Sequence, residues 1–508
     1  MSASPYSRRA LKRSAVHFLA GKGVSALLTL IILFWLVRLL SVEEYGAYVT
    51  FVAGMELTLA MSSLGLPWIA ARYLPEFRLH ASGKALRHFV WRLTARIALL
   101  LVTSSALLYI AMPWLLAHLE LAQQTDVARL FLLVLLAEGL GRHIRENTLE
   151  PLLQQGQAQI SLVARNMVLL FLLSIAALDG AVHLDHVVLA ELAASLLGVM
   201  LAFYSLTTHL HKHRGLLKQD GWQPPSWPVM WHMARHMYFS RLVNLTYSPQ
   251  SFVFLIQHYL GLEATALFGF LYRLYGQVSR YLPATLLFSL VRPKLVASYI
   301  GEGGMVSLTR NANLVGKLSL FVLMPILVFV WLSGGELLTV LSGGKFAHSG
   351  YYLAGLLMAL ILYSQRQILE TMAVVSDKSH LCMWGASLGI LVLPLTYLLL
   401  KYGLGLWGPI IAIIASEMIF NATVIVVMVR VTAYRPDTTG FYKLGAAALA
   451  GFLLSQQVAI PAYGWSRLIA TGVLACGFFM LASYLFKPFR VEERASLNQL
   501  LGRKIFIW

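Results

Sequence analysis

The 508-residue chain consists of long apolar stretches separated by short polar segments. A run of about 20 apolar residues is long enough to cross a bilayer as an α-helix. Fourteen stretches meet this criterion, and we predict a helix in each: residues 16–40, 45–70, 88–116, 127–150, 157–178, 186–209, 236–260, 263–290, 312–333, 350–375, 379–400, 405–429, 441–458 and 466–486. The pattern therefore predicts an all-α polytopic membrane protein with about 14 transmembrane helices.

The basic residues between these stretches test the count, because Lys and Arg collect in cytoplasmic loops. With a cytoplasmic N-terminus, the inner segments contain 29 Lys and Arg residues, among which we count Arg142, Arg145, Arg165 and Lys317. The outer segments contain only Lys345, Lys401 and Arg467. One helix too many or too few would invert every later loop and destroy this pattern. We therefore expect fourteen helices with both termini cytoplasmic.

The longest polar interruption divides the chain into two halves. We predict an N-lobe of six helices at 1–209, a cytoplasmic linker at 210–235, and a C-lobe of six helices at 236–435. The last two helices and a cytoplasmic tail then occupy 436–508. A weak internal repeat supports the division, because SVEEYGAY at 41–48 corresponds to GLEATALF at 261–268. With an even number of helices per lobe, the two lobes are expected to be parallel repeats.

Composition agrees with a membrane protein and excludes several functional classes. Hydrophobic residues make up 58% of the chain and charged residues 12%, too few charges to solvate a soluble surface. The net charge of +18 follows from the basic inner loops, so it does not imply a nucleic-acid partner. Cys382 and Cys476 lie in apolar runs, and no phosphate-binding loop is present. We expect no metal, cofactor, ATP hydrolysis or catalytic residue.

Basic side chains inside the predicted helices are the main candidates for a binding site. A charge within the bilayer costs on the order of 3 kcal/mol and requires a partner, a wet cavity or an interface. Five such residues are not explained by a position near a helix end: Lys22, Arg241, Arg273, Arg280 and Arg366. Together they predict a basic internal cavity that suits an anionic substrate, such as a phosphate or pyrophosphate group.

Uncharged polar residues follow these cations at helical spacing, as Ser25 and Thr29 follow Lys22 along one face of the first predicted helix. The predicted lining residues are Asn244, Ser248, Tyr275 and Gln277. Lipid would penalise such polar stripes, so we expect them to face water in the cavity. Tyrosine rings there also offer surfaces on which sugars can stack. The alternative is helix–helix packing held together by polar side chains.

Four carboxylates also fall within predicted helices: Glu56, Glu138, Glu370 and Glu417. Intramembrane carboxylates can carry protons or coordinate cations during coupled transport. Each can equally pair with a buried arginine and do nothing more. Both interpretations stay open on the sequence alone, including for Arg366 and Glu370, which are spaced i,i+4.

The turn between the first two helices resembles that of the Wzx-like polysaccharide-transporter flippases of the MOP superfamily, which are related to lipid II flippases. The resemblance rests on LLSVEEYGAYVTF at 39–51 and ARYLPEFR at 71–78, with YLGLEATALFGFLYRL at 259–274 as the second-half counterpart. Ser41 stands where the family usually has glycine. The resemblance implies two six-helix lobes around a central cavity that opens alternately to the two sides of the membrane.

The resemblance also implies a function. The cargo would be an oligosaccharide linked to undecaprenyl pyrophosphate, moved from the cytoplasmic to the periplasmic leaflet of a bacterial inner membrane for surface polysaccharide biosynthesis. In the related lipid II flippases, basic residues of the first helix and the second lobe bind the pyrophosphate; Lys22 and Arg241 are the nearest matches by location, and Arg273 and Arg280 follow as cavity cations. Expected partners are this lipid-linked oligosaccharide, membrane lipids and polysaccharide assembly proteins such as the polymerase.

Two rival functions stay open. A multidrug or cation antiporter of the same superfamily would favour an acidic or neutral cavity, and this one is predicted to be basic. A membrane polysaccharide polymerase or ligase usually carries a large outer loop with catalytic Arg and His. The longest outer loop here spans only about residues 333–349, so we expect a transporter and not an enzyme.

Overall fold

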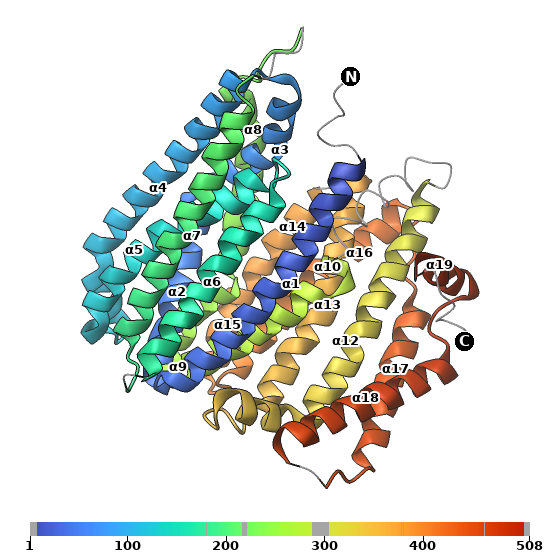
Figure 1. Cartoon of the computed structure of the whole chain (residues 1–508). Coiled ribbons are helices and arrows are strands. Elements are labelled where there is room, and N and C mark those ends of the chain that lie inside the picture. Colours follow the sequence, from blue (N-terminus) through green and yellow to red (C-terminus); the bar gives the residue numbers. More distant parts are fainter. Residues whose placement is uncertain are drawn as a thin grey trace. The chain divides into compact units, whose positions relative to one another are not determined.

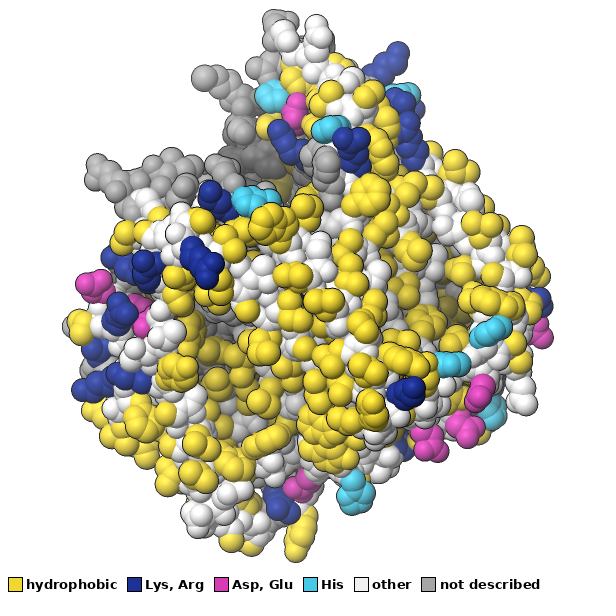
Figure 2. All heavy atoms as spheres, turned by 180° about the vertical axis from the view of Figure 1, so that it is seen from behind, with side chains coloured by type: hydrophobic (Ala, Val, Ile, Leu, Met, Phe, Trp, Pro, Cys, Tyr) yellow, Lys and Arg dark blue, Asp and Glu magenta, His cyan; other side chains and the backbone are white. Residues whose placement is uncertain are grey.

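The computed structural model describes residues 8–178, 180–215, 221–286, 304–376, 378, 380–461 and 463–501. In these ranges all regular structure is helical and no strand occurs, which confirms the all-α prediction (Figure 1). On the face shown in Figure 2, hydrophobic side chains cover a broad area, and most charged side chains lie near its margins. This distribution is that of a surface made to contact lipid.

The helices of the N-terminal part are α1 (Arg8–Leu39), α2 (Val42–Ser62), α3 (Leu66–His80), α4 (Gly83–His118), η1 (Ala122–Gln124), α5 (Thr125–Arg142), the π-helical turn η2 (His143–Leu149), α6 (Gln155–Leu178), α7 (Leu184–Lys212) and α8 (Trp227–Thr246). The remaining helices are α9 (Pro249–Tyr281), α10 (Pro283–Leu286), α12 (Gly304–Ser342), α13 (Gly350–Val375), α14 (His380–Leu388), η3 (Gly389–Leu391), α15 (Val392–Lys401), α16 (Trp407–Val431), α17 (Thr438–Gln456), α18 (Gly464–Phe486) and α19 (Val491–Leu501).

In the described part of the chain, each of the fourteen predicted stretches lies mainly in helix; residues 287–290 of the eighth stretch and residue 379 of the eleventh lie outside the described residues. Ten described segments are long and apolar enough to cross a membrane, or eleven if the bent pair α2–α3 is one span. The number is below fourteen partly because α8 and α9 run on as one 55-residue segment. The chain is therefore a multi-pass membrane protein, and the cytoplasmic location of its termini remains a prediction.

Two of the predicted spans are interrupted, and one junction between spans is formed, at glycine or proline residues. Helices α2 and α3 are bent by 59° about a turn that contains Gly65, whose φ of 78° favours glycine. Helix α8 ends at Thr246, three residues before Pro249, the position at which a kink is expected. Helix α9 contains a non-helical residue, Gly261, with φ 81°, so the predicted seventh and eighth helices meet there.

The motif at 41–48 begins α2 with a reciprocal cap. The Ser41 hydroxyl accepts a hydrogen bond from the Glu44 backbone N–H at 3.1 Å, and the Glu44 carboxylate accepts one from the Ser41 N–H at 3.2 Å. Ser41 therefore gives the helix its N-cap. Gly46 lies on the packed side of α2, where an added Cβ would come within 2.4 Å of the Leu262 carbonyl oxygen. The motif thus fixes both the start of α2 and its close packing.

The chain divides into two compact units. The first comprises residues up to Leu245 together with Gln250–Ala266, and the second comprises Thr246–Pro249 and all residues from Leu267 onward. Helices α1, α4, α5, α6 and α7 pack on one another within the first unit. In the second unit α12 packs against α13, and α17 and α18 pack against α12 and against each other. The exact lobe and linker bounds predicted from the sequence stay predictions.

A buried ion cluster holds the end of the chain to the second unit. Lys317 on α12 is completely enclosed, and its Nζ contacts Asp437 Oδ2 at 2.7 Å and the Glu493 carboxylate of α19. An added Cβ at Gly440, in the first turn of α17, would come within 2.6 Å of the Lys317 side chain, so this position has room for glycine only. Phe489 packs beside the cluster against the apolar face of α12. Lys317, which the sequence placed among the inner-loop charges, is therefore a buried structural residue.

Acid should loosen this cluster. Burial tends to raise the pKa of Asp437, but the hydrogen bond and charge of Lys317 outweigh it and hold this pKa below its usual value. Because the folded-state pKa is the lower one, the stabilisation is complete above the unfolded pKa of about 3.9 and is lost as pH falls through the folded value. Asp437 is the N-cap of α17, where its side chain accepts a hydrogen bond from the Gly440 N–H. Asp437→Asn keeps an oxygen that can accept this bond but removes the negative charge. We expect its thermal unfolding midpoint in detergent to lie well below wild type near neutral pH, and this gap to shrink below about pH 4.

The matched control is Glu492→Gln, because Glu492 is 79% exposed and forms only a 3.7 Å surface pair with Arg310. It should match wild type at every pH. A difference between wild type and Asp437→Asn that stays constant into acid would contradict the assignment.

Candidate functional site

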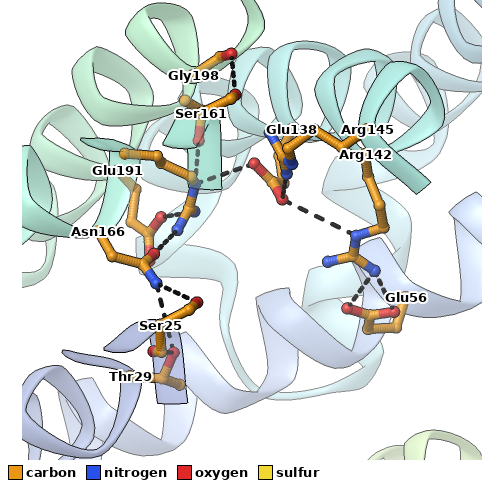
Figure 3. A network of polar contacts seen from close by, with 12 residues as sticks. Ser25, Thr29, Glu56, Glu138, Arg142, Arg145, Ser161, Asn166, Glu191 and Gly198 are labelled. Atoms are coloured by element: carbon orange, nitrogen blue, oxygen red, sulfur yellow. Dashed lines mark hydrogen bonds and ion pairs between the residues drawn. The ribbon is translucent and has the colours of Figure 1, made fainter. Parts of the chain in front are cut away.

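An ion network lies inside the first unit, centred on Glu138 of α5. Its carboxylate contacts Arg145 Nη2 at 2.7 Å and Arg165 Nε at 2.9 Å, and the Glu138 side chain is only 6% exposed. Arg142, one helical turn beyond Glu138, lies farther away at 3.8 Å. Figure 3 shows Glu138 facing both Arg142 and Arg145. A carboxylate buried this deeply requires such partners, since an isolated one would be neutralised.

The network extends to both sides of Glu138. Arg142 donates from Nη1 to both oxygens of Glu56 on α2, each at 2.9 Å. Arg165 of α6 contacts Glu191 of α7 at 2.5 Å, and the Tyr48 hydroxyl donates to the other Glu191 oxygen at 2.9 Å. Three arginines thus balance three glutamates, and α2, α5, α6 and α7 are joined through side chains.

The π-helical turn η2 positions one of these arginines. In this turn the backbone bonds run i to i+5, as in the 3.1 Å bond from the Glu150 N–H to the Arg145 carbonyl. Widening the helix by one residue per turn changes the direction in which later side chains point. Arg145 and Glu138 are seven residues apart and still meet. Turns of this type are common at functional sites.

The predicted polar stripe of α1 lies next to the network. Asn166 of α6 donates from Nδ2 towards the Ser25 hydroxyl at 3.3 Å and the Thr29 hydroxyl at 3.4 Å (Figure 3). Its neighbour Arg165 belongs to the ion network. Ser25 and Thr29 therefore take part in packing between α1 and α6. Such packing by polar side chains is the alternative to a water-filled cavity that the sequence left open. Lys22, one turn earlier on α1, is half-buried.

A second cluster lies in the second unit around Arg366 of α13. Its Nε contacts Glu370 at 2.8 Å, and its Nη1 contacts Glu417 of α16 at 3.4 Å. The guanidinium also lies over the Phe420 ring, with Cζ 4.1 Å from the centroid. It further hydrogen-bonds the hydroxyl of Tyr247, which itself donates to the Ala386 carbonyl at 2.8 Å. Two carboxylates, a ring and a hydroxyl therefore hold Arg366 in place.

The other predicted lining residues of the second unit lie mainly on α9. Tyr275 and Gln277 are buried, and the Tyr275 ring stacks on Tyr272 with centroids 5.3 Å apart. Gln277 Oε1 is enclosed and has no hydrogen-bond partner within the described part of the chain. Arg273 is half-buried and Arg280 is exposed. A buried amide oxygen without a partner marks a place where a ligand or water can bind.

The predicted residues of α8 and the adjoining turn are less enclosed. Arg241 is exposed on α8. Asn244 donates to the Ser240 carbonyl at 3.0 Å, one turn earlier on the same helix. Ser248 is half-buried in the turn between α8 and α9. Of the five candidate cations, Lys22 and Arg241 belong to the first unit and the other three to the second.

The structure also shows what the sequence missed. Arg142, Arg145 and Arg165 were counted as inner-loop charges, but Arg145 is 4% exposed and Arg165 is 13% exposed. Glu191 was not singled out, although it is buried with them. The spacing of Glu138 and Arg142, four residues apart, was the only local signal available. The positive-inside count therefore included residues that serve an internal network.

Among the described residues, no group of three or more His, Cys, Asp or Glu side chains is placed to hold a metal ion.

Comparison with known proteins establishes the fold. No protein-family model and no curated protein sequence matches the chain. Its structure is similar to that of the lipid II flippase MurJ in an inward closed conformation, with a TM-score of 0.72 and 14% identity over 93% of this chain and 98% of that one. It also resembles a mutant of the Vibrio cholerae MATE transporter VcmN, with a TM-score of 0.53 and 12% identity over 82% and 95% of the two chains.

A third similar structure is the eukaryotic MATE transporter AtDTX14, with a TM-score of 0.53 and 13% identity over 84% of this chain and 96% of that one. The chain therefore has the fold of MOP-type transporters. Membership of the Wzx-like family in particular stays a prediction.

Replacing one carboxylate at a time by an amide distinguishes a structural ion pair from a carboxylate that couples transport to protons or cations. Glu138→Gln removes the charge that balances Arg145 and Arg165 in a buried place, so we expect a loss of about 3–5 kcal/mol in stability. Glu56→Gln is the matched control, because Glu56 is 33% exposed and pairs with the accessible Arg142. It should cost about 1 kcal/mol or less. Thermal unfolding of the two purified variants in detergent measures the difference.

If Glu138→Gln unfolded at the wild-type temperature and lost only transport, Glu138 would be a coupling carboxylate and not a structural one.

Proposed function

We propose that the chain is a flippase that moves a polyprenyl-pyrophosphate-linked oligosaccharide from the cytoplasmic to the periplasmic leaflet of a bacterial inner membrane by alternating access. The observation that carries the proposal is the likeness in fold to a lipid II flippase over 93% of the chain. The TM-score of 0.72 with that flippase exceeds the 0.53 with each of the two MATE transporters. The sequence motifs at 39–51 and 259–274 point to the same class of cargo.

The charges inside the helices support an anionic cargo. Arg366 is held between two carboxylates, so we assign it a structural role in positioning α13 against α16. Arg241 and Arg280 are exposed cations within apolar helices, a placement that is costly in lipid and favourable beside a phosphate. Arg273 is seven residues before Arg280 and therefore lies on the same face of α9. We assign pyrophosphate binding in the second unit to Arg273 and Arg280, and we keep Arg241 and Lys22 of the first unit as separate candidates.

The uncharged groups near these cations suit a glycan. The stacked Tyr272 and Tyr275 rings offer amphipathic surfaces, and Gln277 Oε1 is an enclosed acceptor. A sugar hydroxyl is a donor that such an acceptor can bind. The antiporter alternative rests on the similarity to the MATE transporters, and the experiment below separates the two.

The test uses cells that lack this protein. Lipid-linked oligosaccharides are extracted after treatment with a glycosidase that reaches only the periplasmic leaflet, and the protected fraction is measured. We expect protected glycan to accumulate in these cells, and wild-type protein to restore its exposure. The double variant Arg273→Ala/Arg280→Ala should reduce this restoration about tenfold or more, because it loses charge-assisted contacts to phosphate.

The matched control is Arg310→Gln, which removes an arginine that is 61% exposed and pairs weakly with Glu492. It should restore transport fully. Normal exposure of the glycan in cells without the protein, accompanied by loss of drug or cation export, would establish the antiporter instead.

A further inference from the structure

A stripe of basic side chains runs along the first part of α4. Lys84, His88, Arg92 and Arg96 follow one another at four-residue spacing, so they are neighbours on one face of the helix. Lys84, His88 and Arg92 are exposed, and Arg96 is half-buried. Helix α4 contains no Asp or Glu in its 36 residues. Like charges at this spacing repel one another, so the stripe favours an anion that lies across it.

The two inner arginines contact an aromatic ring and no acid. Arg96 Cζ lies 3.6 Å from the centroid of the Trp227 ring at the start of α8, and Arg92 Cζ lies 5.5 Å from it. Within the described part of the chain, neither guanidinium forms an ion pair, and Arg96 Nη1 has no hydrogen-bond partner. The indole face stabilises these cations and leaves their charge uncompensated.

The position of the stripe along α4 indicates where this helix enters the hydrocarbon core of the membrane. The 20 residues after Arg96, Ile97–Leu116, contain no charged side chain. Such a run spans the hydrocarbon core, so Arg96 stands at the boundary between the acyl chains and the headgroups. Tryptophan is the residue type that favours this boundary. Lys and Arg side chains also gather at the end of the first unit that is uppermost in Figure 2.

The surface beyond the stripe is apolar and open. Leu99 and Val102, on the next turns of α4, are 66% and 55% exposed. A ligand that lies along this face therefore meets cations first and a lipid-facing surface directly afterwards. A free phosphate would use only the first part of this surface, whereas a phospholipid would use both.

We propose that Arg92, Arg96 and Trp227 form a binding site for the headgroup of an anionic phospholipid, with Lys84 and His88 extending it towards water. The positive-inside pattern predicts that this lipid belongs to the cytoplasmic leaflet. The acyl chains lie along Leu99 and Val102. The site is separate from the candidate transport residues, and it does not depend on the proposed transport activity.

The test uses the purified full-length protein in detergent, stripped of lipid. Bound lipid is counted by native mass spectrometry during titration with phosphatidylglycerol, and with zwitterionic phosphatidylcholine in parallel. We expect wild type to bind phosphatidylglycerol more tightly than phosphatidylcholine. Arg92→Gln/Arg96→Gln should weaken phosphatidylglycerol binding about tenfold or more, since each basic residue near a headgroup contributes several-fold.

The matched control is Arg129→Gln. Arg129 also lies over a ring, 5.0 Å from the centroid of Tyr109 near the other end of α4, but it pairs with Asp126 at 3.4 Å. Its loss should leave phosphatidylglycerol binding unchanged. A second readout is the thermal midpoint of wild type, which phosphatidylglycerol should raise more than phosphatidylcholine does, independently of how well any variant folds.

Three outcomes would overturn the proposal. One is equal binding of the two lipids by wild type, and another is unchanged phosphatidylglycerol binding by the double variant. The third is complete displacement of the lipid by inorganic phosphate at equal concentration, which would make the site a free-phosphate site. Selective lipid binding that the double variant loses and Arg129→Gln keeps would establish the lipid site.

Discussion

The constraint on which the rest of this structure depends is that a charge inside a bilayer must have a partner. Water is absent there, and both ion solvation and backbone hydrogen bonding have to be supplied by the protein. The first unit meets this demand with three arginines and three glutamates arranged around Glu138. The second meets it with Arg366 between two carboxylates, and Lys317, buried beside the loop between α16 and α17, is likewise paired with two others. In each case the charged groups join helices that are distant in sequence.

This constraint also separates structural charges from candidate functional ones. Charges enclosed by their partners, such as Lys317 and Arg145, are occupied in holding helices together. Arg241 and Arg280 differ from them because they are exposed cations within apolar helices. The exposed cations are therefore the groups that can exchange one anion for another. A transporter of anionic cargo needs both enclosed and exposed charges, since its helices must stay packed together while the cargo binds and dissociates.

The helices could be predicted from the sequence because burial in lipid requires about 20 apolar residues, whatever the tertiary contacts are. The breaks at Gly65 and Pro249 also have local causes that glycine and proline reveal. The ion networks could be predicted from the sequence only in part. The Arg366–Glu370 pair follows from i,i+4 spacing, but Arg165 meets Glu191 across 26 residues and Lys317 meets Glu493 across 176. No local pattern encodes such contacts, so these cations were indistinguishable from loop charges.

The π-helical turn at His143–Leu149 limits the insertions and deletions that this region of the sequence can accept. A π turn contains one residue more than the α-helix requires, and each residue of an α-helix rotates its successors by about 100°. Deleting His143 or Ile144, the residues of this turn that precede Arg145, would leave the composition almost unaltered and yet direct Arg145 away from Glu138. In this region the number of residues matters as much as their identity. A one-residue gap between Glu138 and Arg145 in a related sequence would therefore mark a protein without the contact between these two residues, even where every charged residue is retained.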